Sequence, residues 1–280
     1  MYYIEESDKP KFFEEIFSRV KLETDKIILP VNIEKINSKK AKILASKTLK
    51  ILEKANSKKV VISKNIQNFK EYMDLLNQEE LDIIDGKWLY KILSPEILEY
   101  ILNKENMEKE ETNIYILIND LTEIALQTIK RIANTYKSIN IITNHIEKFK
   151  KIEETLTKEF GIAITVMNNK KKGLAKAKII LNFDFPKEIL NKYNIYEKAI
   201  IVNLQGNMKI TKKRFEGLVI NDYEIEIINP KEYHLEDKKY KTKELYEACF
   251  YKSQPYNNII DKIKKDKVVI KKLYILNGKY

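Results

Sequence analysis

The chain has 280 residues, of which 44% are hydrophobic, a composition that supports one large core or two ordinary ones. No apolar run reaches the roughly 18–20 residues that span a bilayer, and the acidic N-terminus lacks the pattern of a signal peptide. The single Cys249 excludes an internal disulfide framework. We therefore expect a protein without a membrane span in a reducing compartment, the cytoplasm.

The formal charge of +11 is typical of nucleic-acid-binding proteins, but the kind of basic residue argues against that function. Arginine occurs at positions 19, 131 and 214, and the other basic residues are lysine. Specific recognition of bases and phosphates favours the planar guanidinium group. The excess of Lys, Ile and Asn also follows from an A/T-rich genome whatever the function. We therefore expect solvated lysines and no nucleic-acid partner.

Residues 1–110 are expected to form an α/β domain of their own, because short apolar runs alternate there with helical patterns. Asn37 or Ser38 is suited to cap the first long helix, and Pro95 should kink or split the last one. The charged stretch 104–112 suits a domain boundary. Strands are predicted at 27–31, 60–62 and 81–84, and helices at 38–55, 66–76 and 88–103.

Residues 111–230 predict a second α/β domain with a mainly parallel sheet, whose first two strands are parallel neighbours. Residues 231–280 are expected to add helices and a strand that pack back on the domains. Predicted strands lie at 114–118, 139–143, 162–166, 179–183, 199–204, 223–228 and 268–276. Predicted helices lie at 122–136, 146–160, 244–251 and 256–265.

The two halves share a local pattern. When residues 45–79 are shifted by 80 positions, Ala45, Thr48, Ile62 and Phe69 each meet an identical residue without a gap. This offset predicts the order helix, strand, helix in both copies. Gene duplication and the repeated use of one supersecondary unit both explain it.

The segment that follows the second strand of the second domain carries a specific pattern. Asn144 and His145 come after the strand, and a Glu-Lys pair at 147–148 opens the next helix. Residues 174–182 then lead into an apolar strand, with Pro186 shortly after it.

This pattern resembles the cofactor domain of dehydrogenases of the shikimate and amino-acid type. That family follows its second strand with Asn-Arg-Thr and a helix that begins near Glu-Lys-Ala, and a proline follows its fourth strand. Within residues 113–186, His145 replaces the arginine that would hold a ribose phosphate. The resemblance implies a Rossmann-like fold that binds NAD(P) at the carboxyl ends of its strands.

The turn after the first strand departs from the family. A dinucleotide fold uses G-x-G-x-x-G there, so that the backbone approaches the pyrophosphate at a helix N-terminus. Residues 119–124 read NDLTEI, in which Leu121 is bulky and Asp120 and Glu123 place carboxylates where phosphates would lie. Asp120 or Thr122 is expected to cap the helix. We therefore expect no cofactor, with altered binding of NADP or NAD as the alternative and a ligand without an anionic group as another.

Polar residues at the carboxyl ends of three of the predicted strands, or directly after them, are the candidates for a ligand cleft. They are Asn119, Asp120, Asn144, His145 and Asn182. The resemblance implies a catalytic lysine–aspartate pair in the N-terminal domain, but residues 31–35 match that motif too poorly for any catalytic role to be assigned.

Other chemistry is weakly represented. The two histidines, His145 and His234, have no metal-ligand spacing, and both are read as exposed residues. Cys249 is expected to be a buried small hydrophobe. The lysine run at 170–172 is read as solvated, with a phosphate contact as its alternative.

Three functional hypotheses follow. The first is a non-catalytic or regulatory Rossmann-like protein that binds a small ligand or a protein partner. The second is an NAD(P)-dependent oxidoreductase with an atypical phosphate turn. The third is a lysine-rich nucleic-acid-binding protein, which should show a steep salt dependence.

Overall fold

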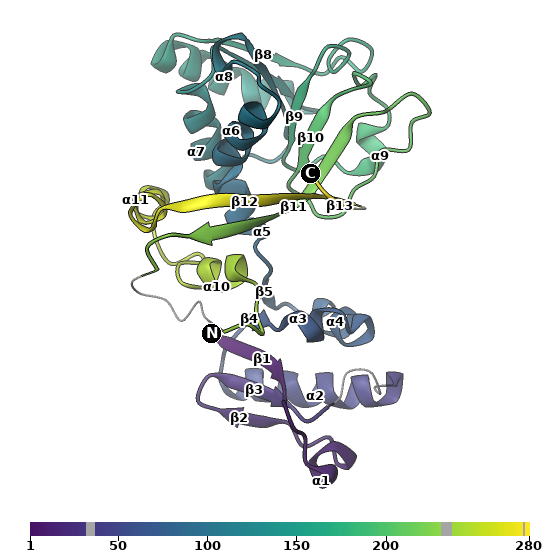
Figure 1. The fold of residues 1–280 in the computed structure, drawn as a ribbon. Coiled ribbons are helices and arrows are strands. Elements are labelled where there is room, and N and C mark those ends of the chain that lie inside the picture. Colours follow the sequence, from purple (N-terminus) through teal and green to yellow (C-terminus); the bar gives the residue numbers. More distant parts are fainter. Residues whose placement is uncertain (32–36, 231–236, 277) are drawn as a thin grey trace. The chain divides into compact units, whose positions relative to one another are not determined.

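The computed structural model describes residues 1–31, 37–230, 237–276 and 278–280 (Figure 1). Its contacts divide the chain into two compact units, each of which is discontinuous in sequence. Unit 1 comprises residues 1–88 and 230–254, and unit 2 comprises residues 89–229 and 255–280. These limits differ from the boundaries expected at residues 110 and 230, because residues 89–110 belong to unit 2 and residues 230–254 return to unit 1.

Unit 1 is built around a mainly parallel sheet. Its elements are β1 (Tyr2–Glu6), α1 (Phe12–Ile16), β2 (Lys21–Glu23), β3 (Lys26–Leu29), α2 (Ser38–Lys54), β4 (Lys59–Ile62), α3 (Lys64–Gln67), α4 (Lys70–Asn77), β5 (Asp82–Ile84) and α10 (Thr242–Ala248). The strand order is β2-β3-β1-β4-β5, and only the β2–β3 pair is antiparallel among the described strands. Side chains of α2 and α4 form the apolar core on one face, and α10 covers the other face.

Local signals explain much of unit 1. The side chain of Asn37 accepts a hydrogen bond from the Lys40 N–H at 2.9 Å and caps α2, as predicted. The single helix predicted at 66–76 is wrong, because Phe69 leaves the helical conformation with ψ of 81° and separates α3 from α4. Strand β1 was not predicted, since Glu5 and Glu6 interrupt its apolar pattern.

Unit 2 contains a larger sheet covered by helices. Its elements are α5 (Lys87–Ile92, which begins in unit 1), α6 (Ser94–Lys104), the 3-10 turn η2 (Lys109–Glu111), β6 (Asn113–Leu117), α7 (Glu123–Ala133), β7 (Ser138–Ile142), α8 (Ile146–Phe160), β8 (Ala163–Met167), β9 (Ile179–Asn182), α9 (Lys187–Leu190), β10 (Ile200–Asn203), β11 (Leu218–Ile227), α11 (Tyr256–Asp266), β12 (Val268–Ile275) and β13 (Gly278–Lys279). The predicted break at Pro95 is confirmed, since α5 ends before Leu93 and α6 starts with proline in its first turn.

The sheet of unit 2 has the order β13-β12-β11-β10-β9-β6-β7-β8. All neighbours from β8 to β11 are parallel, whereas β12 and β13 continue the sheet in the antiparallel sense. The predicted parallel pairing of β6 and β7 is confirmed, with Ile114 opposite Ile139. The central strands β9 and β10 are buried along their whole length, as expected for a parallel sheet covered on both faces.

The order helix, strand, helix occurs in both halves, as the shift of 80 residues predicts. In unit 1 it is α2, β4 and then α3 with α4, and in unit 2 it is α7, β7 and α8. Strand β4 lies in a parallel sheet, as β7 does.

None of the helices in the described residues is long and apolar enough to cross a membrane.

Candidate functional site at the strand-order reversal of unit 2

The parallel strands of unit 2 reverse their order between β6 and β9. Numbered along the chain from β6 to β11, they lie in the order 3-2-1-4-5-6. This is the strand order of dinucleotide-binding sheets, in which ligands bind outside the carboxyl ends of the strands where the order reverses. Unit 2 therefore has a Rossmann-like fold. The position where a cofactor would bind lies beyond Leu117 and Asn182, the last residues of β6 and β9.

A carboxylate of the chain itself occupies the backbone donors at this position. Asp184, two residues after β9, accepts hydrogen bonds from the Asn119 N–H at 2.8 Å to each oxygen. It also accepts one from the Asp120 N–H at 2.6 Å. In a dinucleotide fold the backbone N–H groups of this turn face the pyrophosphate. Asp184 therefore takes the place of an anionic ligand. Sequence reasoning missed Asp184, although it too follows the carboxyl end of a predicted strand.

The N-terminus of α7 is also engaged. The Thr122 hydroxyl accepts a hydrogen bond from the Ala125 N–H at 3.2 Å, which confirms Thr122 as one of the two predicted caps. Asp120 is exposed and pairs with Lys148 at 3.5 Å. Glu123 lies in the first turn of α7. The negative charge near this helix end opposes the binding of a diphosphate.

Two of the predicted cleft residues are brought into direct contact. The side-chain oxygen of Asn119 accepts a hydrogen bond from the Asn144 N–H at 2.8 Å, and so links the loops after β6 and β7. His145 is exposed, and its backbone N–H donates to the Thr143 hydroxyl at 3.0 Å. Asp184, Asn119, Asp120 and Asn144 are therefore linked by hydrogen bonds, and His145 follows Asn144 in the chain.

Asn182 has a different environment, because it is fully buried. Its amide donates to the Phe185 carbonyl at 2.9 Å and accepts from the Phe185 N–H at 2.9 Å. It also donates to Asn203 at 3.0 Å, and Asn203 in turn donates to Asn221 at 2.9 Å. Asn221 is paired with both backbone groups of Met208.

These three residues, Asn182, Asn203 and Asn221, form an asparagine ladder across β9, β10 and β11. Asn203 also donates to the carbonyl of Gly206. Buried amides are stable only when their donors and acceptors are satisfied, and the ladder achieves this with side chains and loop backbone. The ladder binds the backbone of Phe185, in the loop after β9, and of Met208, in the loop after β10. It therefore holds both loops at the carboxyl end of the sheet.

The electrostatics of Asp184 reflect two opposing effects. Burial raises the pKa of its carboxyl group, and the hydrogen bonds from the Asp120 and Asn119 N–H groups lower it. Burial is the larger effect, and the pKa lies above the ordinary value. The negative charge of nearby Asp120 acts in the same direction as burial, while Lys91 opposes it.

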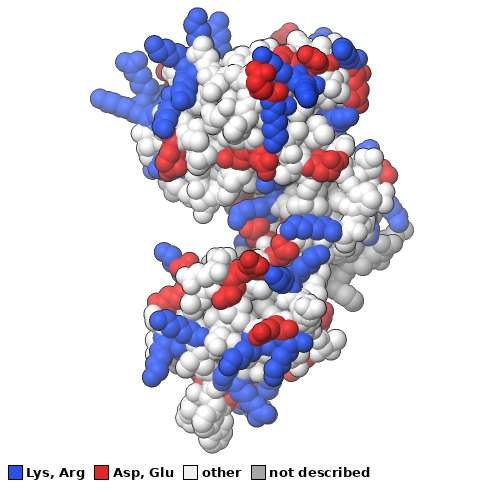
Figure 2. Space-filling view, turned by 180° about the vertical axis from the view of Figure 1, so that it is seen from behind, with Lys and Arg blue, Asp and Glu red and all other residues white. Residues whose placement is uncertain are grey.

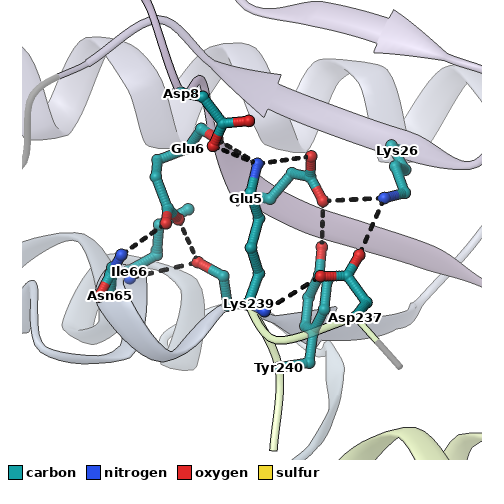
Figure 3. Close-up of polar contacts among 10 residues, drawn as sticks. Glu5, Glu6, Asp8, Lys26, Asn65, Ile66, Asp237, Lys239 and Tyr240 are labelled. Atoms are coloured by element: carbon teal, nitrogen blue, oxygen red, sulfur yellow. Dashed lines mark hydrogen bonds and ion pairs between the residues drawn. The ribbon is translucent and has the colours of Figure 1, made fainter. Parts of the chain in front are cut away.

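Unit 1 contains a separate polar cluster at the carboxyl end of β1 (Figure 3). Glu5 is buried and accepts hydrogen bonds from Lys26 at 3.1 Å, Lys239 at 3.2 Å and the Tyr240 hydroxyl at 3.0 Å. Lys26 also pairs with Asp237 at 3.1 Å. Both oxygens of Glu5 are therefore engaged with neighbouring side chains. The cluster ties the returning segment, residues 237–240, to the sheet.

The pH dependence of this cluster follows from the signs of its pKa shifts. Burial opposes the charge of Asp237, but hydrogen bonds from the Lys239 N–H and from Lys26 outweigh it and lower the pKa of Asp237. Burial likewise opposes the charges of Lys26 and Lys239, yet their carboxylate partners raise both lysine pKa values. A carboxyl group whose pKa is lowered by folding stabilises the fold at pH values above the ordinary pKa of that group. A lysine whose pKa is raised stabilises the fold at pH values below the ordinary lysine pKa.

We therefore expect unit 1 to be most resistant to urea near neutral pH. Resistance should fall in acid, from the ordinary pKa of an aspartate downward, and in alkali, from the ordinary pKa of a lysine upward. The single Trp88 reports on the C-terminal part of unit 1, residues 237–254, because its ring lies 5.5 Å from Tyr251 and 6.1 Å from Phe250. Urea titrations followed by its fluorescence measure the effect. Asp237→Asn should flatten the acid limb, and an unchanged acid limb would contradict this account.

Cys249 is exposed, so its expected burial is wrong, since it is the residue that ends α10; its thiol donates a hydrogen bond to the Leu245 carbonyl at 3.3 Å. His234 and most of residues 31–35 lie outside the described residues. Lys171 and Lys172 are exposed in a turn whose backbone is held by Asn169. Among the described residues, no group of His, Cys, Asp or Glu could hold a metal ion.

No protein-family model and no curated protein matches the sequence. Solved structures do resemble the chain. Shikimate 5-dehydrogenase from Listeria monocytogenes, in complex with shikimate and NAD, has 10% identity and a TM-score of 0.35, covering 79% of this chain and 85% of its own. L-tryptophan dehydrogenase from Nostoc punctiforme has 9% identity and a TM-score of 0.34, covering 76% of this chain and 64% of its own. Ornithine carbamoyltransferase from Pyrococcus furiosus has 11% identity and a TM-score of 0.31, covering 72% and 71%.

Two of these three structures are a shikimate dehydrogenase and an amino-acid dehydrogenase. The chain spans just under two thirds of the length of the tryptophan dehydrogenase. The strand order of unit 2, rather than these similarities, is what identifies its fold.

Proposed function

We propose that this chain is a non-catalytic or regulatory Rossmann-like protein, which binds a small ligand lacking a diphosphate, or a protein partner. The observation that carries the proposal is the carboxylate of Asp184 on the N–H groups of Asn119 and Asp120. A diphosphate would have to displace this carboxylate, and charge-assisted hydrogen bonds are stronger than neutral ones.

The surrounding residues support the same conclusion. Asp120 and Glu123 add negative charge at the helix end, and the turn has no glycine to let a pyrophosphate approach. His145 is exposed where the family that residues 113–186 resemble has an arginine, and an imidazole lacks the planar fork of N–H donors with which a guanidinium group binds a phosphate. The residues present therefore do not fit a dinucleotide. The chain has one cysteine, a composition typical of proteins in a reducing compartment, and this supports the cytoplasm.

A second candidate function is an NAD(P)-dependent oxidoreductase that binds its cofactor in an altered way. The strand order 3-2-1-4-5-6 favours it, because sheets of this order bind dinucleotides where the order reverses. Such binding would require Asp184 to leave its three hydrogen bonds and the loop after β6 to change its conformation.

Isothermal titration of the full chain with NADPH and with NADH separates the two functions. We expect no binding tighter than about 50 µM for either nucleotide. The intrinsic fluorescence of NADPH, which changes in a protein site, provides an independent readout. Tighter binding would contradict the proposal and give first place to the oxidoreductase.

A further inference from the structure

Helix α1, in unit 1, exposes its apolar side chains to solvent, whereas a surface helix normally buries them. None of its residues is buried. Large apolar side chains stand in solvent on this helix and directly after it, each exposing between 57% and 71% of its surface: Phe12, Phe13, Ile16 and Phe17. We call these four residues the apolar tip. An exposed cluster of this kind marks an interaction surface, because burial of such side chains is normally a main source of stability.

The acidic residues of α1 face the protein instead. Glu14 pairs with Lys21 of β2 at 2.7 Å, and Glu15 pairs with Lys40 of α2 at 3.4 Å. Both glutamates are less exposed than the phenylalanines beside them. Ion pairs therefore anchor α1 to unit 1, and its apolar side chains remain available to contact a binding partner.

The apolar surface continues from α1 onto α2. Phe12, Ile16 and Ile43 line a hollow of about 440 Å³, with Lys39 at its wall. Ile43 is itself 39% exposed. Through Phe12 and Ile16 the apolar tip thus shares a hollow with Ile43, and the apolar surface is wider than the short helix alone.

Basic residues accompany this surface in the chain. Lys21 and Lys40 pair with the two glutamates, and further basic side chains are exposed on α2 and within a few residues of α1: Lys9, Lys11, Arg19, Lys39 and Lys42. Figure 2 shows uncoloured atoms at the tip, at the lower end of the view where Figure 1 places α1, with lysine and arginine side chains beside them. The surface therefore combines protruding apolar groups with an excess of positive charge.

We propose that the apolar tip inserts into the headgroup region of an anionic phospholipid bilayer, while the surrounding lysines bind the lipid headgroups. Aromatic and aliphatic side chains bury at the boundary between headgroups and acyl chains, and basic residues near the surface are attracted to anionic lipid. The partner is identified by this pairing of protruding apolar groups with positive charge. A protein partner for the same surface would need acidic residues around an apolar socket. Single-stranded nucleic acid favours aromatic platforms with arginine, and Arg19 is the only arginine in unit 1.

Co-sedimentation of the full chain with vesicles tests the proposal. We expect binding to vesicles of phosphatidylcholine with phosphatidylserine, little binding to phosphatidylcholine alone, and a loss of binding at high salt. Phe12→Ser/Phe13→Ser should reduce binding about tenfold or more, because both side chains are exposed in solution and would be buried in the bilayer. Lys11→Gln/Lys39→Gln should reduce only the part of the binding that depends on phosphatidylserine.

Matched variants elsewhere serve as controls. Ile228→Ser changes an exposed apolar residue of unit 2, and Lys171→Gln/Lys172→Gln changes two exposed lysines there, so both should leave vesicle binding unchanged. The absence of binding to anionic vesicles would overturn the proposal, as would binding that survives Phe12→Ser/Phe13→Ser. Self-association in sedimentation velocity that this variant abolishes, without vesicle binding by the parent, would show instead a surface between copies of the chain. Binding to single-stranded RNA in place of vesicles would overturn it as well.

Discussion

The variant Asp120→Gly/Leu121→Ala/Glu123→Ala/Asp184→Ala is expected to bind NADPH and NADH at least about tenfold more tightly than the parent chain. Each change removes one obstacle. Asp184→Ala frees the N–H groups of Asn119 and Asp120, the two other carboxylates leave the helix end, and Leu121→Ala opens the approach to the backbone. The expected gain corresponds to about 1.4 kcal/mol per factor of ten.

Partial variants assign the effect to its cause. Asp184→Asn removes the charge but keeps an amide oxygen that can accept from the same backbone N–H groups, so we expect a smaller gain than with Asp184→Ala. The variant that changes only residues 120, 121 and 123 should gain little, because the carboxylate of Asp184 would still occupy the donors. Isothermal titration measures each affinity, and circular dichroism verifies that the fold is retained. If Asp184→Ala and the fourfold variant both fail to bind NADPH and NADH, the contact of Asp184 with the turn after β6 is not what excludes the nucleotide.

Asn203→Ala is expected to lower the free energy of unfolding of unit 2 by about 2–4 kcal/mol. The fully buried amide of Asn203 connects Asn182 to Asn221 and also donates to the Gly206 carbonyl. Its removal leaves one N–H of Asn182 and the carbonyl of Gly206 without their partner, and each unsatisfied buried group costs about 1–3 kcal/mol. Loss of the buried side chain adds a packing term.

Hydrogen exchange provides the measurement, because it resolves the two units within one sample. Peptides that cover β9, β10 and β11 should exchange faster in Asn203→Ala, while peptides of unit 1 serve as the internal reference. Asn258→Ala is the matched control, since Asn258 is exposed on α11 in the same unit. Equal protection of β9–β11 in Asn203→Ala and in this control would mean that the asparagine ladder contributes no stability.

Periodicity and local capping made most elements predictable from the sequence. Helix α8 has the predicted bounds, because its apolar residues recur at helical spacing and Gly161 ends it in the left-handed conformation. Asn37 and Thr122 act as the caps that their sequence positions indicate. The parallel pairing of β6 with β7 was predicted because a helical spacer separates the two apolar runs, as in a strand–helix–strand crossover. These features depend on residues close together in the chain.

The candidate site was predictable only in part. Asn119, Asp120 and Asn144 could be placed at the carboxyl edge of the sheet, because parallel strands end at one edge. The burial of Asn182 could not be predicted, because it depends on Asn203 and Asn221. These partners lie on the neighbouring strands β10 and β11, which are distant in sequence. Similarly, the return of residues 230–254 to unit 1 rests on contacts such as Glu5 with Tyr240, which no local pattern encodes.

The amino-acid sequence by itself determined the α/β class, the alternation of strands and helices, and a phosphate turn without glycine. Only the tertiary structure decided what occupies that turn. Asp184 is 65 positions from Asn119 in the chain, and it reaches the Asn119 N–H because β9 pairs directly with β6 in a register that sets Asn182 opposite Leu117. A strand register is chosen by the burial of many side chains at once, so contacts made beyond the strand ends follow from the whole sheet and not from nearby residues.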